Sequence, residues 1–263
     1  LTFIDGNQLD RLFHVQANTT VTISNLTVMN GAAPINDPHG GGIANGGNLT
    51  LTNLIIQDNT AYGGTGISQG GGVNNYGYLL INKCAIVGNY AEGKQNGGGG
   101  IGTSGTGTTI IINSTISGNT TNGGGGGIFN TGSLTVKSST LVENQALSGG
   151  GLFTTYATFG NSIVANNTAS TYNNCDVYFS ITSSGYNLES EDSCEFHNTG
   201  DQINTDPVIG SLYYNCGSTL THALLTDSPA IDAGNPLDFP ETDQCGVTRP
   251  QGSNPDIGAF EYY

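Results

Sequence analysis

The sequence predicts an all-β protein folded as a right-handed parallel β-helix, a solenoid with three short strands in each coil. The first observation behind this prediction is a glycine-rich motif that occurs five times along the 263 residues. The copies are GGGIAN (40–45), GGGVNN (70–75), GGGIGT (98–103), GGGIFN (125–130) and GGGLFT (149–154). Repeats 24 to 30 residues apart indicate a coiled chain, because each repeat can bury its apolar face only against its neighbours.

The second observation is the character of the segments between the glycine runs, such as TVTISNLTVMN, NLTLTNLIIQDN and TTIIINSTISGN. They are rich in Val, Ile, Leu and Thr and alternate with period two, which is typical of strands and not of helices. A further short apolar piece follows each glycine run, beginning at Ile43 in the first copy. Three strand-sized pieces per repeat therefore predict three strands per coil.

The third observation is an asparagine that follows the second strand of successive repeats. Asparagine tolerates the left-handed backbone that a tight corner requires, and its amide can pair with the amides in the coils above and below. The sequence thus predicts a stacked asparagine ladder, consisting of Asn59, Asn89, Asn119, Asn144 and Asn166. The glycines have a matching role, since the backbone there bends sharply or passes close to the next coil.

We expect one elongated domain in two parts. Residues 1–155 form the regular coils, and residues 156–263 form irregular coils that continue the same β-helix after the glycine runs stop. With no Trp, one Met and only 10% charged residues, the composition suits a narrow aliphatic column covered by Ser, Thr and Asn.

The charge distribution limits the partners. The net charge is −15, divided as about −2 over residues 1–160 and about −13 over residues 161–263. Nucleic acids and anionic membranes are disfavoured, and so are acidic polysaccharides unless a divalent cation bridges the two surfaces. No segment is predicted to insert into a membrane. No cofactor is required, although the acidic half offers oxygen ligands for Ca²⁺.

Two families resemble this chain. The glycine-run repeats are similar to those of polymorphic outer-membrane proteins, which build extracellular β-helices. The segments GYNL, DPVIG, THALL, SPAIDAGN, TDQCGVTRP and PDIGAFEY resemble secreted proteins of the choice-of-anchor Q type. The resemblance implies a secreted or cell-surface β-helix without an assigned catalytic activity. Such proteins usually have further strands upstream of the LTFIDG-like segment, and this chain does not include them.

Four of the five cysteines lie in the irregular part, which favours disulfides in a secreted protein. Cys175 and Cys194 flank the GYNL segment, and we expect them to pair. Cys216 and Cys245 stand where the choice-of-anchor family usually has Gly and Arg, and this departure suggests a second bridge. Cys84, beside Ile86 on a core strand, is expected to be a buried free thiol.

The carboxylates do not support a polysaccharide-active enzyme, which would need acidic groups on neighbouring coils. Asp58 is followed by Gly88 and Gly118 at the equivalent positions of the next two coils. A weak candidate metal site near the C-terminus comprises Asp238, Glu241 and Asp243. We therefore expect a protein that is not an enzyme, with a polysaccharide lyase or hydrolase as the second alternative.

The leading hypothesis is a structural protein that associates with itself. A solenoid without caps exposes core side chains and unpaired backbone at both ends, and two different adhesive ends lead to an open head-to-tail filament. The residues expected at these ends are Leu1, Phe3 and Ile4 in the first coil, and Ile257, Phe260, Tyr262 and Tyr263 in a final strand.

An adhesin or glycan-binding module is the alternative, because Tyr62, Tyr76, Tyr78 and Tyr90 lie on neighbouring coils and could form a strip that stacks on sugars. Ice binding through a flat threonine row that includes Thr50, Thr52 and Thr135 is a weaker hypothesis, since no Thr-x-Thr recurs in every coil. Six sequons make the chain a candidate glycoprotein. Their acceptors are Asn18, Asn25, Asn48, Asn113, Asn119 and Asn166.

Overall fold

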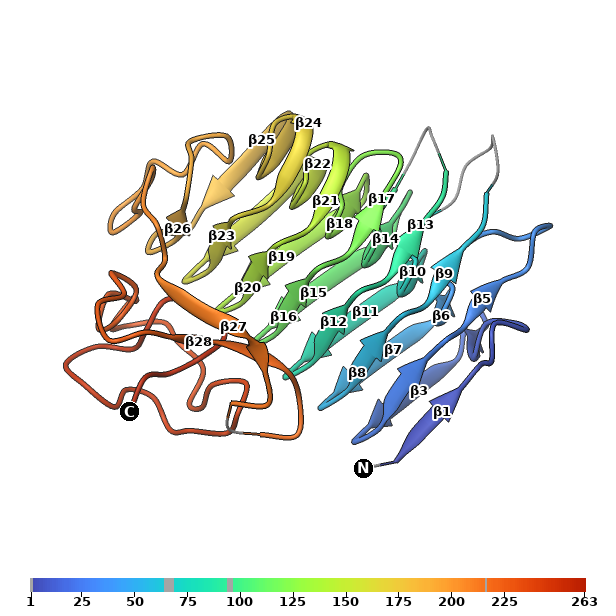
Figure 1. Ribbon diagram of the computed structural model, residues 1–263, viewed down its shortest axis with the longest axis horizontal. Coiled ribbons are helices and arrows are strands. Elements are labelled where there is room, and N and C mark those ends of the chain that lie inside the picture. Colours follow the sequence, from blue (N-terminus) through green and yellow to red (C-terminus); the bar gives the residue numbers. More distant parts are fainter. Residues whose placement is uncertain (1, 64–68, 94–96, 216) are drawn as a thin grey trace.

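The computed structural model describes residues 2–63, 69–93, 97–215 and 217–263, so Leu1 and Cys216 lie outside the described residues. The described residues form β-strands and no helix. Most strands stack in parallel into three sheets that enclose one elongated core (Figure 1). The predicted all-β parallel solenoid is therefore confirmed.

Each sheet collects the equivalent strands of successive coils. Sheet A contains β1 (Phe3–Asp5), β4 (Thr27–Met29), β8 (Ile55–Gln57), β12 (Ala85–Val87), β16 (Thr115–Ser117), β20 (Thr140–Val142), β23 (Ile163–Ala165) and β26 (Leu188–Glu189). Sheet C contains β5 (Ala32–Ala33), β9 (Thr60–Ala61), β13 (Tyr90–Ala91), β17 (Thr120–Thr121), β21 (Gln145–Ser148) and β24 (Thr168–Thr171).

Sheet B is the broadest face and has two rows of strands. The short row contains β2 (Phe13–Val15), β6 (Ile43–Asn45), β10 (Val73–Asn75), β14 (Ile101–Thr103) and β18 (Ile128–Asn130). The long row contains β3 (Thr20–Ser24), β7 (Asn48–Thr52), β11 (Tyr78–Asn82), β15 (Thr108–Ile112) and β19 (Ser133–Lys137). Two nine-residue strands, β22 (Leu152–Gly160) and β25 (Cys175–Ser183), each run through both rows.

The repeat keeps identical positions in register from coil to coil. Val73 pairs with Ile43 in one neighbouring coil and with Ile101 in the other, and all three side chains are fully buried. Burying one such side chain stabilises the fold by roughly 1.5–3 kcal/mol. The glycine beside them is required by close approach, because a Cβ on Gly71 would lie 2.4 Å from the carbonyl oxygen of Gly99.

A regular coil contains four strands rather than the predicted three. The additional strand is the two-residue strand of sheet C, as in β9 and β13. Its two residues are too few to produce a visible alternation in the sequence, so the pattern did not reveal it. The parallel stacking also continues beyond residue 155, through β23, β25 and β26.

The asparagine ladder runs through the interior with one correction. The amide oxygen of each asparagine accepts from the backbone N–H and the side-chain amide of the one in the preceding coil, at 2.9–3.0 Å. Asn167, not the predicted Asn166, is the fifth member. The left-handed corner lies one residue earlier than predicted, because positive φ belongs to the residue before each ladder asparagine. These residues are Asp58, Gly88, Gly118, Glu143 and Asn166.

A second ladder contains Cys84. The backbone N–H groups of Cys84, Ser114 and Ser139 donate in turn to the hydroxyls of Ser114, Ser139 and Ser162 in the following coils. Cys84 therefore occupies a position that the next three coils fill with serine. It is a buried free thiol, as expected, and burial raises its pKa to about 12.

We expect native Cys84 not to react with thiol reagents at neutral pH, because the reactive thiolate is suppressed and the sulfur is inaccessible. Cys84→Ser should keep the fold and change stability by less than about 1 kcal/mol, since serine makes the same ladder contacts one coil later. Labelling monitored by mass spectrometry, with urea-unfolded protein as the control, tests the first point. Stoichiometric labelling of the folded chain would contradict it.

The last coil is covered by the segment that follows it. Cys175 and Cys194 form the predicted disulfide, with Cα atoms 4.9 Å apart. Phe196, which is 1% exposed, packs on Phe159 with ring centroids 5.5 Å apart. The buried Glu189 carboxylate accepts from the backbone N–H groups of Ser193 and Cys194. The predicted bare C-terminal end of the column is therefore wrong.

Residues 206–215 and 217–263, here called the C-terminal lobe, fold back along the outer face of sheet A (Figure 1). The lobe includes one antiparallel pair, β27 (Ile209–Tyr213) and β28 (Thr221–Leu224). Gly258 donates its N–H to the carbonyl oxygen of Asn161 at 2.8 Å, and Thr115 donates to Gln244 at 2.7 Å. These contacts explain why outward-facing residues of sheet A are buried from β12 to β23.

The C-terminal residues proposed as an assembly end do not form a strand at the end of the column. Ile257 and Phe260 are buried in the lobe core together with Ile163 of the solenoid, while Tyr262 and Tyr263 lie at the surface. Residues 255–261 are buried without interruption, whereas the residues of a strand with one exposed face would alternate between buried and exposed. Phe3 and Ile4 lie on β1 and are exposed.

A buried ionic cluster lies within the lobe. The Arg249 guanidinium lies 3.1 Å from Glu261, and both side chains are fully buried. It also donates to the carbonyl oxygens of Asp256 and Gly258, at 2.6 and 2.7 Å. Asp243 accepts from the backbone N–H groups of Val247 and Glu261. Desolvation raises the pKa of Asp256 to about 6 and also raises the pKa of Asp243 and Glu261.

Stability is expected to be higher at about pH 5 than at about pH 7.5. The pKa of each of these acids is higher in the folded protein than in the unfolded chain. Their contribution to the free energy of unfolding is therefore fully present below about pH 4 and is lost as the pH rises through about 6. Burial lowers the pKa of His222. The contribution of neutral His222 to the free energy of unfolding is therefore lost as the pH falls below 6.5.

His222→Gln should therefore steepen the loss of stability with rising pH. Thermal melts of both proteins across this range measure the effect. A melting temperature that rises steadily from about pH 5 to about pH 7.5 in the parent chain would contradict the prediction.

Candidate functional site

The predicted site residues do not form one site. Tyr76 and Tyr78 lie at sheet B, whereas Tyr90 belongs to sheet C and Tyr62 follows a strand of that sheet. Tyr90 accepts a hydrogen bond from Asn122 at 2.9 Å. The proposed tyrosine strip is therefore divided between two faces, and the threonine row that includes Thr50 is interrupted by Leu80 and Ile110.

The predicted carboxylate cluster is also not brought together. Asp238 pairs with Lys137, Asp243 is buried on backbone N–H groups, and Glu241 is exposed. Over residues 2–63, 69–93, 97–215 and 217–263 there is no group of three or more His, Cys, Asp or Glu side chains placed to hold a metal ion.

The sequons separate into two groups by burial. Asn113 and Asn119 cannot carry a glycan in this fold, because both are buried and their amides donate to Thr242 and to the ladder. Asn18, Asn25, Asn48 and Asn166 are exposed. The second disulfide stays a prediction, since Cys216 is not among the described residues.

A buried serine–histidine pair lies between column and lobe. The Nε2 atom of His222 is 2.9 Å from the Ser117 hydroxyl, and its Nδ1 atom is 2.8 Å from the carbonyl oxygen of Gly210. Glu143 lies 4.0 Å from Nε2. Both members of the pair are at most 2% exposed, so a substrate has no access and the pair joins the lobe to sheet A.

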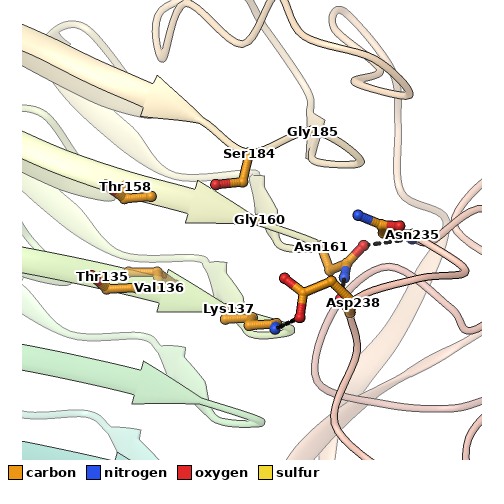
Figure 2. Close-up of a pocket in the computed structure, with 10 residues that line it drawn as sticks. All are labelled: Thr135, Val136, Lys137, Thr158, Gly160, Asn161, Ser184, Gly185, Asn235 and Asp238. Atoms are coloured by element: carbon orange, nitrogen blue, oxygen red, sulfur yellow. Dashed lines mark hydrogen bonds and ion pairs between the residues drawn. The ribbon is translucent and has the colours of Figure 1, made fainter.

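A groove lies on the outer face of sheet B and is formed by β19, β22 and β25 near the lobe. It consists of two adjoining hollows of about 160 and 280 Å³ that share Thr135 and Thr158. The smaller hollow, here called the Gly160 hollow, is lined by Thr135, Val136, Lys137, Thr158, Gly160, Asn161, Ser184, Gly185, Asn235 and Asp238 (Figure 2). The larger one, here called the Tyr156 hollow, is lined by Gly132, Ser133, Leu134, Thr135, Tyr156, Ala157, Thr158, Ser180 and Thr182.

The Gly160 hollow has a fixed polar wall where the lobe meets the solenoid. Lys137 forms an ion pair with Asp238, while Asn161 donates to the carbonyl oxygen of Asp238 at 2.8 Å (Figure 2). Asn161 also accepts from the backbone N–H of Asn235 at 2.7 Å. Because Asn161 is 3% exposed and bonded on both sides, the wall is held in one position.

Tyr156 is the aromatic residue in the lining of the Tyr156 hollow, and Phe179 packs against it. The rings of Tyr156 and Phe179 stack with centroids 5.1 Å apart and an interplanar angle of 12°. Both side chains are more than half exposed. A register shift opposite Thr155 inserts an extra residue in β25, and such bulges redirect side chains. On the other side, Leu134 pairs with Ala157, which places the small Ser133 opposite Tyr156, and both Ser133 and Tyr156 line the hollow.

This arrangement suits binding rather than bond cleavage. One end offers an apolar ring face, and the other offers hydroxyl, amide, amine and carboxylate groups, the usual mixture of a small-molecule site. Asp238 is the sole carboxylate among the described residues that line the groove, whereas glycoside hydrolysis uses two.

Sequence reasoning missed the groove because its parts are distant in the chain. Lys137 and Asp238 are 101 residues apart. The available signal was the long apolar strand LFTTYATFG, in which Gly160 ends the strand without a side chain.

No helix in the described part of the chain has the length and hydropathy needed to cross a membrane. No protein-family model matches the sequence, and the searches of curated proteins and of solved structures found no match.

Proposed function

We propose that this chain is a non-catalytic module of a secreted or cell-surface protein that binds glycans in the groove on sheet B. The main observation behind this proposal is that an exposed aromatic stack and a polar hollow lie side by side along three neighbouring strands. Sugars have apolar C–H faces that pack on aromatic rings and hydroxyl rims that pair with amides, hydroxyls and charged groups.

Two further features support this assignment. The disulfide between Cys175 and Cys194 is compatible with an oxidising, extracellular environment. The resemblance of the repeats and of the C-terminal segments to surface β-helix families points to the same location. Head-to-tail assembly through the first coil stays a prediction. The C-terminal contact proposed for it is dropped, because Ile257 and Phe260 are buried in the lobe core.

Tyr156→Ala is expected to weaken glycan binding roughly two- to twelvefold, because one aromatic contact of this kind contributes about 0.5–1.5 kcal/mol. Tyr213→Ala is the matched control, since Tyr213 is similarly exposed but belongs to β27 of the lobe. A glycan array identifies the ligand, and titration calorimetry compares the variants. Failure of the parent chain to bind any glycan, or equal affinity of both variants, would contradict the proposal.

A further inference from the structure

We propose that the groove receives the end of an uncharged oligosaccharide rather than its middle, with the terminal sugar in the Gly160 hollow. This inference rests on the glycan binding proposed above and specifies the ligand and its direction. Three features of the groove carry it: a blocked end, a missing side chain and a neutralised charge.

The groove is closed at one end and open at the other. Along β22 the outward residues are Tyr156, Thr158 and Gly160, and Asn161 then meets the lobe. Asn235 and Asp238 stand across the path at this point (Figure 2). At the opposite end, Ser133, Tyr156 and Ser180 are exposed to solvent. An oligosaccharide can therefore enter the groove past Tyr156 but cannot continue past the lobe.

The Gly160 hollow exists because one side chain is absent. Gly160 pairs with Lys137 of β19, and Ser184 follows the end of the neighbouring strand β25. A Cβ at Gly160 would lie 3.3 Å from the Cβ of Ser184, so a larger side chain would occupy the hollow. From Tyr156 to Gly160 the groove extends about 13 Å, at about 3.3 Å per strand residue, which is the length of a short oligosaccharide.

The charges in the hollow favour an uncharged sugar. Lys137 supplies donors, and Asp238 beside it supplies acceptors, an arrangement that suits two adjacent hydroxyls. The amine is already neutralised by Asp238, and residues 161–263 carry about −13. A uronate would therefore meet net repulsion rather than a free cation.

The test uses titration calorimetry of the full chain with an uncharged oligosaccharide identified on the array. Three comparison ligands are used. Two are the same oligosaccharide carrying a bulky conjugate, either at its non-reducing end or at its reducing end. The third is a uronate oligosaccharide of equal length. Gly160→Val is the variant that fills the hollow. Thr52→Val, which lies on β7 of the same sheet and away from the groove, is the control.

We expect Gly160→Val to bind the uncharged oligosaccharide at least tenfold more weakly than the parent protein, and Thr52→Val to bind it with unchanged affinity. One of the two blocked oligosaccharides should bind the parent protein more weakly by a similar factor. The uronate oligosaccharide should not bind. Melting temperatures establish that both variants are folded, and Gly160→Ala gives a smaller change if the valine variant is unstable. Three results would overturn the inference and leave the proposed glycan binding intact. The first is equal affinity for both blocked oligosaccharides, and the second is binding of the uronate oligosaccharide. The third is unchanged affinity of Gly160→Val together with reduced affinity of Tyr156→Ala. If no glycan binds the parent chain, the proposed function fails first and this inference fails with it.

Discussion

Replacing Arg249 with methionine is expected to lower the free energy of unfolding by about 3–5 kcal/mol, the cost of breaking a buried ion pair by removing one partner. Methionine keeps much of the volume but leaves the Glu261 carboxylate buried without its cation. The carbonyl oxygens of Asp256 and Gly258 lose their donors at the same time. The same segment donates the N–H groups of Gly258 and Ala259 to Asn161 and Thr140 of the solenoid. We therefore expect the lobe to detach before the column unfolds.

Chemical denaturation measures the loss, and binding of a hydrophobic dye reports exposure of the outer face of sheet A. Arg11→Met is the comparison variant. The Arg11 side chain is itself 8% exposed, but its partner Asp37, 2.9 Å away, is half exposed. We expect a smaller loss than for Arg249→Met, because water solvates the carboxylate that remains. Equal stability of Arg249→Met and the parent chain would show that the lobe is held by its apolar contacts alone.

The column could be predicted from the sequence because its information is local and repeated. Ile43, Val73 and Ile101 recur beside the same glycines, so one coil fixes the register of the next. The error of one residue at Asn166 arose where two asparagines are adjacent: the ladder member is the one after the left-handed residue, and Asn167 fills that place. The sequence alone does not distinguish the two.

The lobe and the groove could not be predicted in the same way, because both depend on contacts without a period. Residues 257–263 resemble a strand in composition, yet they are covered from both sides through Arg249, Asp243 and the outer face of sheet A. The groove appears only where the lobe places Asp238 beside Lys137. The clearest sequence feature, the tyrosines on neighbouring coils, was divided between two sheets by the fourth strand of each coil.

The asparagine ladder is the second feature with a large expected effect. Asn119→Ala should destabilise the protein by about 3–5 kcal/mol, because several buried polar groups lose their partners at about 1–3 kcal/mol each. The amide of Asn119 donates to the carbonyl oxygen of Ile86 at 2.8 Å and to Asn144 at 2.9 Å. Its oxygen accepts from the backbone N–H and the side chain of Asn89 at 3.0 and 2.9 Å.

Asn166→Gly is the matched control, since this asparagine is exposed, lies outside the ladder and has a φ of 56° that glycine adopts freely. We expect it to change stability by only a few tenths of a kcal/mol, within the range of ordinary surface substitutions. Urea denaturation of both variants compares them directly. If Asn166→Gly proved as damaging as Asn119→Ala, the interior hydrogen bonds would not distinguish the two positions, and the stability of the coils would have to come from the corners instead.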